Sequence, residues 1–170
     1  LQTASGARAR AYLRERGLCA LAPTSVVPNW QAEARKFTPD LRVLVLSGPD
    51  RKKYHRSIPY ADLVITSFAL LHRDIEKLRP HTFHLVVLDE AQNIKNPHAK
   101  VAQAACKLDA KHRICLSGTP VENHLGELWS LMKFLVPGFL GSEESFNNTY
   151  RKPIENNGDT ERNEMLKKRV

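Results

Sequence analysis

The chain has 170 residues, of which 42% are hydrophobic and 26% are charged, and its formal net charge is +8. This length and composition fit one globular domain with a sizeable core and argue against a low-complexity chain. No stretch is long and apolar enough to cross a membrane, so no membrane partner is expected. The surplus of positive charge favours a polyanionic partner, and nucleic acid is the commonest of these.

Five short apolar runs predict buried strands, and none of them shows clean alternation with polar residues. They cover residues 18–22, 42–46, 63–66, 84–88 and 113–116. Strands without alternation are typical of a parallel sheet that is buried on both faces. Segments with apolar residues at helical spacing separate them, at 30–37, 67–78 and 100–108. This order of strands and helices predicts a doubly wound α/β domain, in which ligands bind beyond the carboxyl ends of the strands.

After Ser117 the pattern changes to helices alone. The apolar residues of this part lie on one face of a predicted helix and so predict core packing; they are Leu125, Leu128, Trp129, Met132 and Leu135. Pro137 and Gly138 are expected to end this helix. The polar segment from Asn156 onward predicts either a short surface helix or partial disorder.

The three cysteines are Cys19, Cys106 and Cys115, an odd number without metal-ligand spacing. Cys19 and Cys115 lie in apolar runs, which is typical of free thiols packed in a core. An intracellular, reducing compartment is therefore expected.

The fourth apolar run ends directly in two acids, Asp89 and Glu90. Alone, this pattern is more typical of a strand that meets solvent and turns into a helix. The alternative is metal chemistry, because one carboxylate at such a strand end can hold Mg²⁺ on a nucleotide and a second can activate water.

Polar residues also follow the other strands. Thr24 and Ser25 follow the first, where helix capping and phosphate binding are equally good explanations. A second hydroxyl pair, Thr66 and Ser67, ends the third. After the fifth strand, Gly118 permits a tight turn between two hydroxyl residues, Ser117 and Thr119.

Together these strand ends resemble the first RecA-like lobe of superfamily-two helicase-like ATPases, specifically the Swi/Snf-type family of DNA-dependent ATPases. The stretches that resemble motifs Ia, Ib, II and III are 22–25 with Asn29-Trp30, 65–68, 89–92 and 116–120. Two further stretches are similar to this family rather than to other helicases, namely 93–96, and 127–131 with Phe134-Leu135 and Pro137. The glutamine at position 92, where relatives often have histidine, resembles the bacterial HepA/RapA-like branch.

The resemblance implies a three-layer RecA-like fold with a mostly parallel sheet, helices on both faces and a helical C-terminal extension. Residues 1–136 would form the lobe, without its Walker A loop, and residues 137–170 would form the extension with its charged tail. An unrelated α/β fold is disfavoured, because it would have to match four strand-end motifs in the right order by chance.

The resemblance also implies the roles of single residues, with ATP and Mg²⁺ as cofactors. Asp89 would hold the Mg²⁺ of MgATP, Glu90 would activate the attacking water, and Gln92 would sense the γ-phosphate. Motif III would couple this site to DNA through Ser117, Gly118 and Thr119. Residues expected at the nucleic acid are Pro23, Thr24, Ser25, Thr66, Ser67, Lys95 and Asn96.

Two parts of such a motor are expected outside this sequence. No glycine is followed by lysine, so the phosphate-binding G-x-x-x-x-G-K-[ST] loop is missing, and the chain is expected to begin just after it. A second RecA-like lobe with arginine fingers does not fit after Val170. The parent protein is therefore expected to be a DNA-stimulated ATPase, and the 170 residues alone are expected to be inactive, because loss of an arginine finger costs roughly 10³- to 10⁵-fold in rate.

Three functions follow from this reading. The favoured one is a translocase on double-stranded DNA that remodels protein–nucleic acid complexes, with RNA polymerase or another DNA-bound protein as a partner. A strand-separating helicase is the second. The third is a module without enzyme activity that docks on nucleic acid or RNA polymerase, which the intact Asp89 and Glu90 disfavour.

Overall fold

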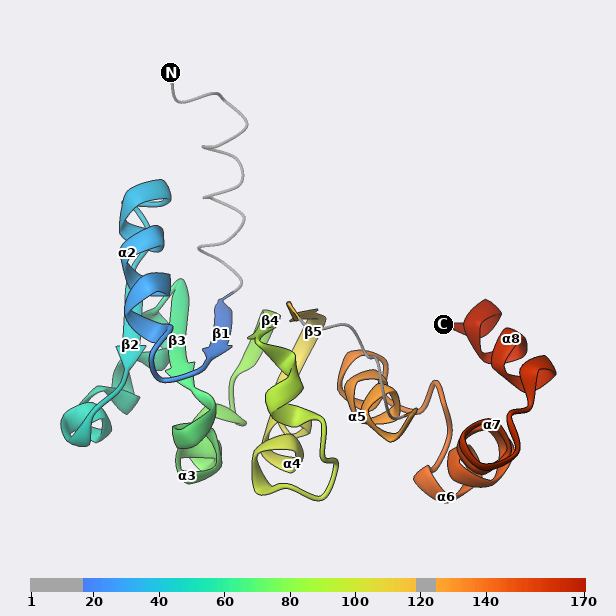
Figure 1. Ribbon diagram of the computed structural model, residues 1–170. Helices are drawn as coiled ribbons and strands as arrows, with labels where there is room; N and C mark the ends of the chain where they lie inside the picture. Colours follow the sequence, from blue (N-terminus) through green and yellow to red (C-terminus); the bar gives the residue numbers. More distant parts are fainter. Residues whose placement is uncertain (1–16, 119–124) are drawn as a thin grey trace.

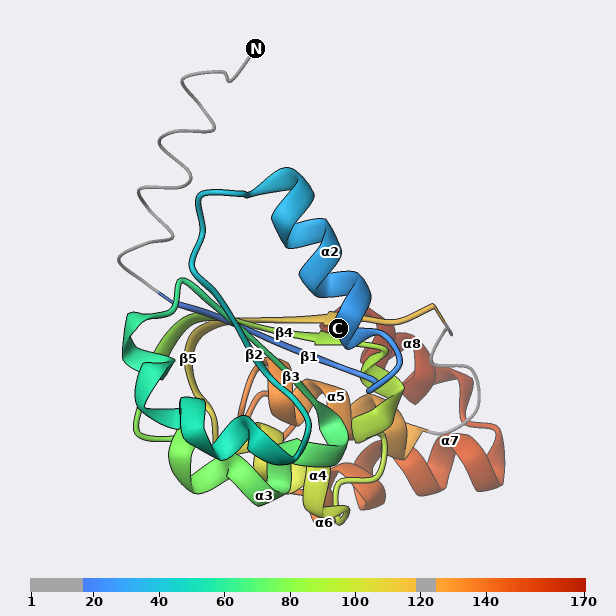
Figure 2. The same ribbon diagram turned by 90° about the vertical axis from the view of Figure 1, so that its left-hand side faces the viewer.

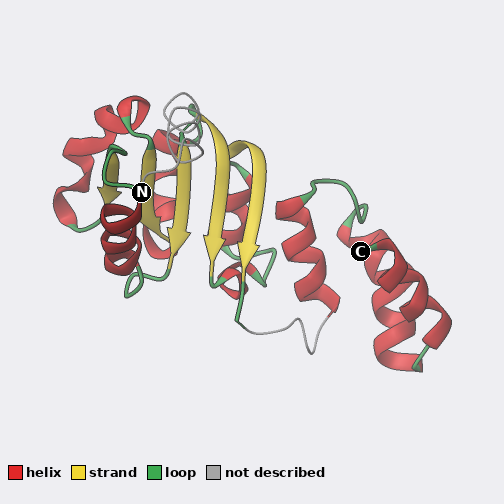
Figure 3. Ribbon diagram, turned by 90° about the horizontal axis from the view of Figure 1, so that it is seen from above, coloured by secondary structure: helices red, strands yellow, loops and turns green. Residues whose placement is uncertain are grey.

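The computed structural model describes residues 17–118 and 125–170. In this part of the chain, five parallel strands form one sheet in the order β2-β3-β1-β4-β5. The strands are β1 (Leu18–Ala22), β2 (Val43–Leu46), β3 (Leu63–Ser67), β4 (Thr82–Asp89) and β5 (Asp109–Leu116). All five carboxyl ends point the same way (Figure 3), which confirms the predicted parallel α/β sheet.

Helices cover both faces of the sheet, as predicted. Helix α2 (Val27–Phe37) lies on one face, and α3 (Phe68–Leu78), α4 (Lys100–Cys106) and α5 (Leu125–Leu135) lie on the other (Figures 1 and 2). Two 3₁₀ segments that sequence patterns did not predict, η1 (Pro49–Tyr60) and η2 (Ala91–Ile94), follow β2 and β4.

The central strand β1 explains why the apolar runs do not alternate with polar residues. Cys19 and Leu21 pack into the core on the side of α3 and α4, whereas Ala20 and Ala22 pack into a smaller cluster under α2. All four side chains are at most 1% exposed. A strand whose two faces both meet helices needs apolar residues at every position.

Strand β5 departs from the prediction that every strand is buried on both faces. It forms one edge of the sheet and begins at Asp109, four residues before the predicted run. Its Ile114 and Leu116 are 42% and 44% exposed, and exposed residues alternate with half-buried ones. Helix α2 packs over β2 and β3, at the opposite side of the sheet (Figure 1), so it does not cover the exposed side chains of β5.

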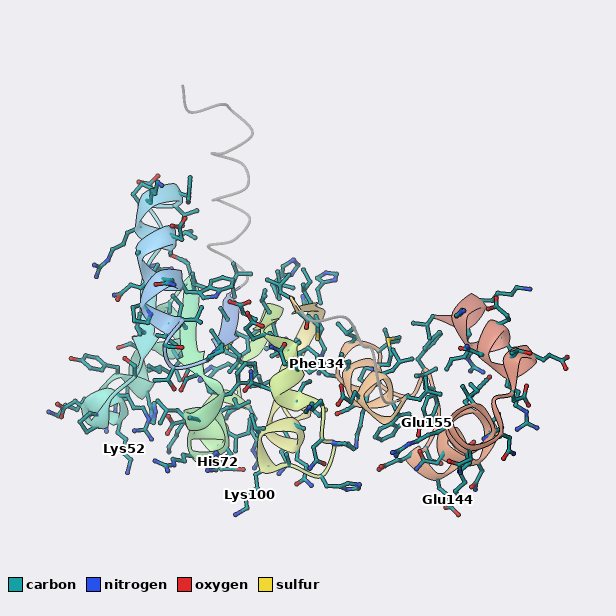
Figure 4. All side chains as sticks on the ribbon, in the orientation of Figure 1. Lys52, His72, Lys100, Phe134, Glu144 and Glu155 are labelled. Carbon is teal, nitrogen blue, oxygen red and sulfur yellow. The ribbon has the colours of Figure 1, made fainter. Side chains whose placement is uncertain are left out.

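The C-terminal segments form a second small core beside the sheet (Figure 1). They are α6 (Glu143–Phe146), the π-helix η3 (Asn147–Arg151), α7 (Lys152–Asn157) and α8 (Thr160–Arg169). The segment from Asn156 onward was expected to be either a short helix or partly disordered, and the structure has a helix there, α8. Helix α5 joins the two cores, since Phe134 faces the sheet (Figure 4) and Trp129 packs against Phe146 and Leu166. The division of the chain into a lobe (residues 1–136) and a helical extension (residues 137–170) remains a prediction.

None of the helices in the described part of the chain is long and apolar enough to cross a bilayer. The three cysteines are free thiols, and Cys19 is fully buried. Burial raises the pKa of the Cys19 thiol to about 12. Burial, reinforced by the neighbouring Cys106, raises the pKa of the Cys115 thiol to about 12 as well.

We expect Cys19 and Cys115 to resist alkylation in the folded chain. At pH 8 a thiol with a pKa near 12 is a thiolate in only about one molecule in 10⁴, and the thiolate is the nucleophile. Iodoacetamide at pH 8, followed by mass spectrometry, checks this, with the chain unfolded in urea as the control in which the thiols react. Alkylation of either residue within minutes in the folded chain would contradict these pKa values.

Candidate functional site

The parallel sheet brings the polar strand ends to one edge. Ala22 pairs with Ser67 at the ends of β1 and β3, and Asp89 pairs with Leu116 at the ends of β4 and β5. Side chains just beyond these positions therefore line one edge of the sheet, as expected for a ligand site in this fold class.

A chain of hydrogen bonds joins the residues that follow β4 and β5. Nε2 of Gln92 donates to Oε2 of Glu90 at 2.6 Å, and the Ser117 hydroxyl donates to Oε1 of Gln92 at 3.1 Å. An ionised carboxylate only accepts hydrogen bonds, so the amide nitrogen of Gln92 must face Glu90 and its oxygen must face Ser117. The glutamine thereby links the two predicted motifs.

The backbone of Glu90 lies in the left-handed region, with φ 56° and ψ 55°. It is the only residue other than glycine with positive φ in the described ranges. Such a conformation costs on the order of 1–3 kcal/mol and tends to occur at functional sites. It turns the chain from β4 directly into η2, whose Ala91 and Ile94 are fully buried and so fix the turn.

The carboxylate of Asp89 is held from another element. The indole Nε1 of Trp30, in α2, donates to Oδ2 of Asp89 at 2.8 Å. Both side chains are half-buried. The resemblance to motif Ia includes Trp30 but predicts no role of its own for this side chain, although a tryptophan N–H that faces a domain interior needs an acceptor.

A cavity of about 320 Å³ opens beyond the ends of β1, β2 and β3. Its lining includes Thr24, Gly48, Ser67 and Arg73. The Ser67 hydroxyl is buried without a hydrogen-bond partner and immediately precedes α3, whose start has no side-chain cap. A buried polar atom without a partner, free N–H groups of a helix start and an arginine together suit an anion such as phosphate.

Residues 12–169 match the family described as the SNF2-related domain. The chain belongs to this family. YwqA of Bacillus subtilis, named as an ATP-dependent helicase/translocase, is 48% identical over 145 residues, which are 84% of this chain and 16% of YwqA. The TATA-binding protein-associated factor MOT1 of Saccharomyces cerevisiae is 38% identical over 136 residues, 79% of this chain and 7% of MOT1.

A solved structure of similar fold is the Sulfolobus solfataricus SWI2/SNF2 ATPase core in complex with dsDNA. It is 40% identical to this chain, with a TM-score of 0.86, and the match covers 98% of this chain and 34% of that one. The SNF2-related domain described here thus has the RecA-like α/β fold of that core. It spans a small part of the relatives that it matches.

The carboxylates of this SNF2-related domain fit a nucleotide-bound Mg²⁺ better than a metal held by protein alone. Within the described ranges, no three histidine, cysteine, aspartate or glutamate side chains gather as metal ligands. Mg²⁺ usually binds one or two carboxylates and takes its other ligands from phosphates and water. Asp89 meets that requirement, because Trp30 engages only one of its two carboxylate oxygens.

The predicted nucleic-acid residues of the SNF2-related domain do not all share one surface. Thr24 and Ser67 line the same cavity, and Ser25 is exposed beside them. The prediction for Thr66 is wrong for its side chain, which is fully buried and donates to the Leu46 carbonyl at 3.0 Å. Its hydroxyl binds β3 to β2 and cannot reach a phosphate. The carbonyl of Pro23 closes the turn into α2 by accepting from the N–H of Val26 at 2.9 Å.

Lys95 and Asn96 line a different cavity, between the segment after η2 and the helices α5 and α6. Lys95 pairs with Glu127 at 3.3 Å, and the Asn96 side chain accepts from the N–H of His98. Gly118 is exposed with open space around it, and Thr119 lies outside the described residues.

Helix α5 of the SNF2-related domain braces the segment that follows the acidic pair. The buried Ser130 hydroxyl donates to the carbonyl of Ile94 at 2.5 Å, at the end of η2. Arg113 in β5 donates to the carbonyls of Leu108 and Phe134, with its guanidinium over the Phe134 ring. Helix α5 therefore supports the site through η2, by Ser130, and through β5, by Phe134.

Proposed function

We propose that this chain is part of a DNA-stimulated ATPase that moves along double-stranded DNA and remodels protein–nucleic acid complexes. The observation that carries the proposal is the hydrogen-bonded chain from Glu90 through Gln92 to Ser117 at the ends of β4 and β5. A carboxylate tied through an amide to the next strand end suits a group that must respond to a nucleotide and transmit its state.

In this function Asp89 would hold the Mg²⁺ of ATP, which would supply positive charge beside the phosphates. Glu90 orients and deprotonates the attacking water, from a backbone conformation that aims its side chain out of the strand. Gln92 senses whether that carboxylate is engaged and passes the change to Ser117. Gly118 beside it leaves the backbone free to adjust.

The nucleic acid lies over the cavity lined by Thr24, Ser67 and Arg73. Hydroxyls, helix N–H groups and arginine bind phosphates without reading bases, which suits movement along any sequence. The net charge of +8 favours the same ligand. Support also comes from the Sulfolobus solfataricus core, which is 40% identical to this chain and was solved in complex with dsDNA.

The partners proposed are double-stranded DNA, a second RecA-like lobe and a DNA-bound protein such as RNA polymerase. Support for a DNA-bound protein comes from relatives named as TATA-binding protein-associated factors. We place the function in the bacterial cytoplasm, with the nucleoid, or in the nucleus if the source is eukaryotic.

The test is ATP turnover by the full-length natural protein with and without duplex DNA. We expect stimulation by DNA that falls with salt. The stimulation should be weaker in Arg73→Gln than in Arg79→Gln, because Arg73 lines the cavity whereas Arg79 follows the last turn of α3 and does not. A strand-displacement assay in parallel separates a translocase from an unwinding helicase. An ATP turnover that is the same with and without DNA would contradict the proposal, and so would equal DNA stimulation in the two arginine variants.

The 170-residue chain alone is expected to show no measurable turnover. Its sequence contains no Gly-Lys pair, so no phosphate-loop lysine is available to the β- and γ-phosphates. Purified chain and full-length protein are compared at equal concentration with saturating Mg²⁺ and ATP. Measurable turnover by the chain alone would contradict this expectation.

A further inference from the structure

The contact between Trp30 and Asp89 joins residues 59 positions apart in the sequence. Trp30 lies in the first turn of α2, and Asp89 is the last residue of β4. The 2.8 Å distance from Nε1 to Oδ2 is that of a strong hydrogen bond to a carboxylate. It is a contact between the helix layer and the acidic strand end.

Packing fixes the direction of this donor. The Trp30 ring packs against the cluster formed by Ala20, Val27 and Ile65, and it borders a cavity that Val87 of β4 also lines. An indole has a single N–H and accepts no hydrogen bond, so a ring held in one orientation offers its donor in one direction only. The carboxylate of Asp89 must therefore turn Oδ2 toward Trp30.

The consequence for Asp89 is a fixed carboxylate plane. The terminal torsion of an aspartate is broad, and without a partner the group would sample many orientations. When Oδ2 accepts from Trp30, the remaining oxygen Oδ1 is held in a single orientation. A carboxylate that binds a metal ion needs such a fixed orientation. Partners of this kind typically change metal affinity 10- to 100-fold when they are removed.

We propose that Trp30 is a positioning residue that presents Asp89 to the nucleotide-bound Mg²⁺. The proposal rests on the proposed function, since it needs Asp89 to meet that metal. Trp30 acts through Asp89 and has no role in the chemical step itself. Val27, the first residue of the same helix, lines the cavity that Thr24 also borders, so one element bears both part of the cavity wall and the donor.

The test compares two affinities for a fluorescent ADP in the full-length protein, one with Mg²⁺ and one in EDTA. In Trp30→Phe, which keeps the ring and removes the N–H, we expect the affinity with Mg²⁺ to fall about 10- to 100-fold. The affinity in EDTA should stay unchanged, because no metal is present to be positioned. Asp89→Ala sets the size of the complete loss.

The matched control is Trp129→Phe, which removes an indole N–H that donates to the Gly141 carbonyl in the second core. Neither affinity should change there. Equal affinities in Trp30→Phe and the natural protein would overturn the proposal, and so would an equal fall with and without Mg²⁺, which indicates a packing role. If the natural protein itself gains no affinity from Mg²⁺, the proposed function fails first and this inference with it.

Discussion

Glu90→Gln in the full-length protein is expected to lower DNA-stimulated ATP turnover by about 10²- to 10⁴-fold, the usual contribution of a positioned general base. Glutamine has the size of glutamate, and its amide oxygen can still accept from Nε2 of Gln92, which donates to this side chain at 2.6 Å. The change therefore removes the base while it leaves the hydrogen-bonded chain to Ser117 in place. Steady-state turnover at saturating Mg²⁺, ATP and duplex DNA measures the effect.

The control for this experiment is Glu76→Gln, an exposed residue of α3 that pairs with Arg79. It makes the same chemical change away from the strand ends and should leave turnover unchanged. Affinity for ATP is measured in both variants, because Glu90→Gln should still bind nucleotide. Turnover in Glu90→Gln within threefold of the natural protein would remove Glu90 from the chemical step.

Asp74→Ala is expected to lower the free energy of unfolding by about 3–5 kcal/mol, because it leaves Arg51 buried without its partner. Nε and Nη2 of Arg51 reach the two Asp74 oxygens at 2.5 and 3.2 Å, and the side chains are 9% and 3% exposed. This pair ties η1 to α3 beside the proposed phosphate cavity. Urea unfolding followed by circular dichroism measures the loss.

Two comparisons make this prediction specific to burial. Asp50→Ala breaks an exposed ion pair, in which the side chains of Lys53 and Asp50 are 73% and 70% exposed. This change should lower the free energy of unfolding by less than about 1 kcal/mol. The double change Arg51→Met with Asp74→Leu removes both charges and should regain much of the lost stability. Similar losses in Asp74→Ala and Asp50→Ala would show that the buried pair contributes no more than a surface pair.

The sheet and the acidic strand end could be predicted because their signals are local. The run 18–22 coincides with β1, and the Asp89-Glu90 pair follows its apolar run directly. Strand β4 begins two residues before its predicted start, at Thr82, and β5 four residues before, at Asp109. In β5 three of the four extra residues are polar, and they belong to the strand because they pair with β4, which no local pattern shows.

The contacts that define the site could not be predicted, because they join distant segments or depend on backbone conformation. No propensity places glutamate at positive φ, as at Glu90. The acceptor of Trp30 lies 59 residues away, and the partner of Thr66 is a carbonyl of the neighbouring strand. The motif identified Thr66 by its hydroxyl, whereas the fold uses that hydroxyl inside the sheet.

The position of β1 has a consequence for the order of folding. Although it is the first of the described strands in the sequence, it lies at the centre of the sheet, and both of its neighbours, β3 and β4, come later. Its side chains are apolar on both faces, so during synthesis β1 remains uncovered until β4 has emerged. Strands that are far apart in the sequence pair slowly, and the intermediates that precede this pairing are prone to aggregate. Synthesis of this chain should therefore depend on chaperones more than that of a helical protein of equal length.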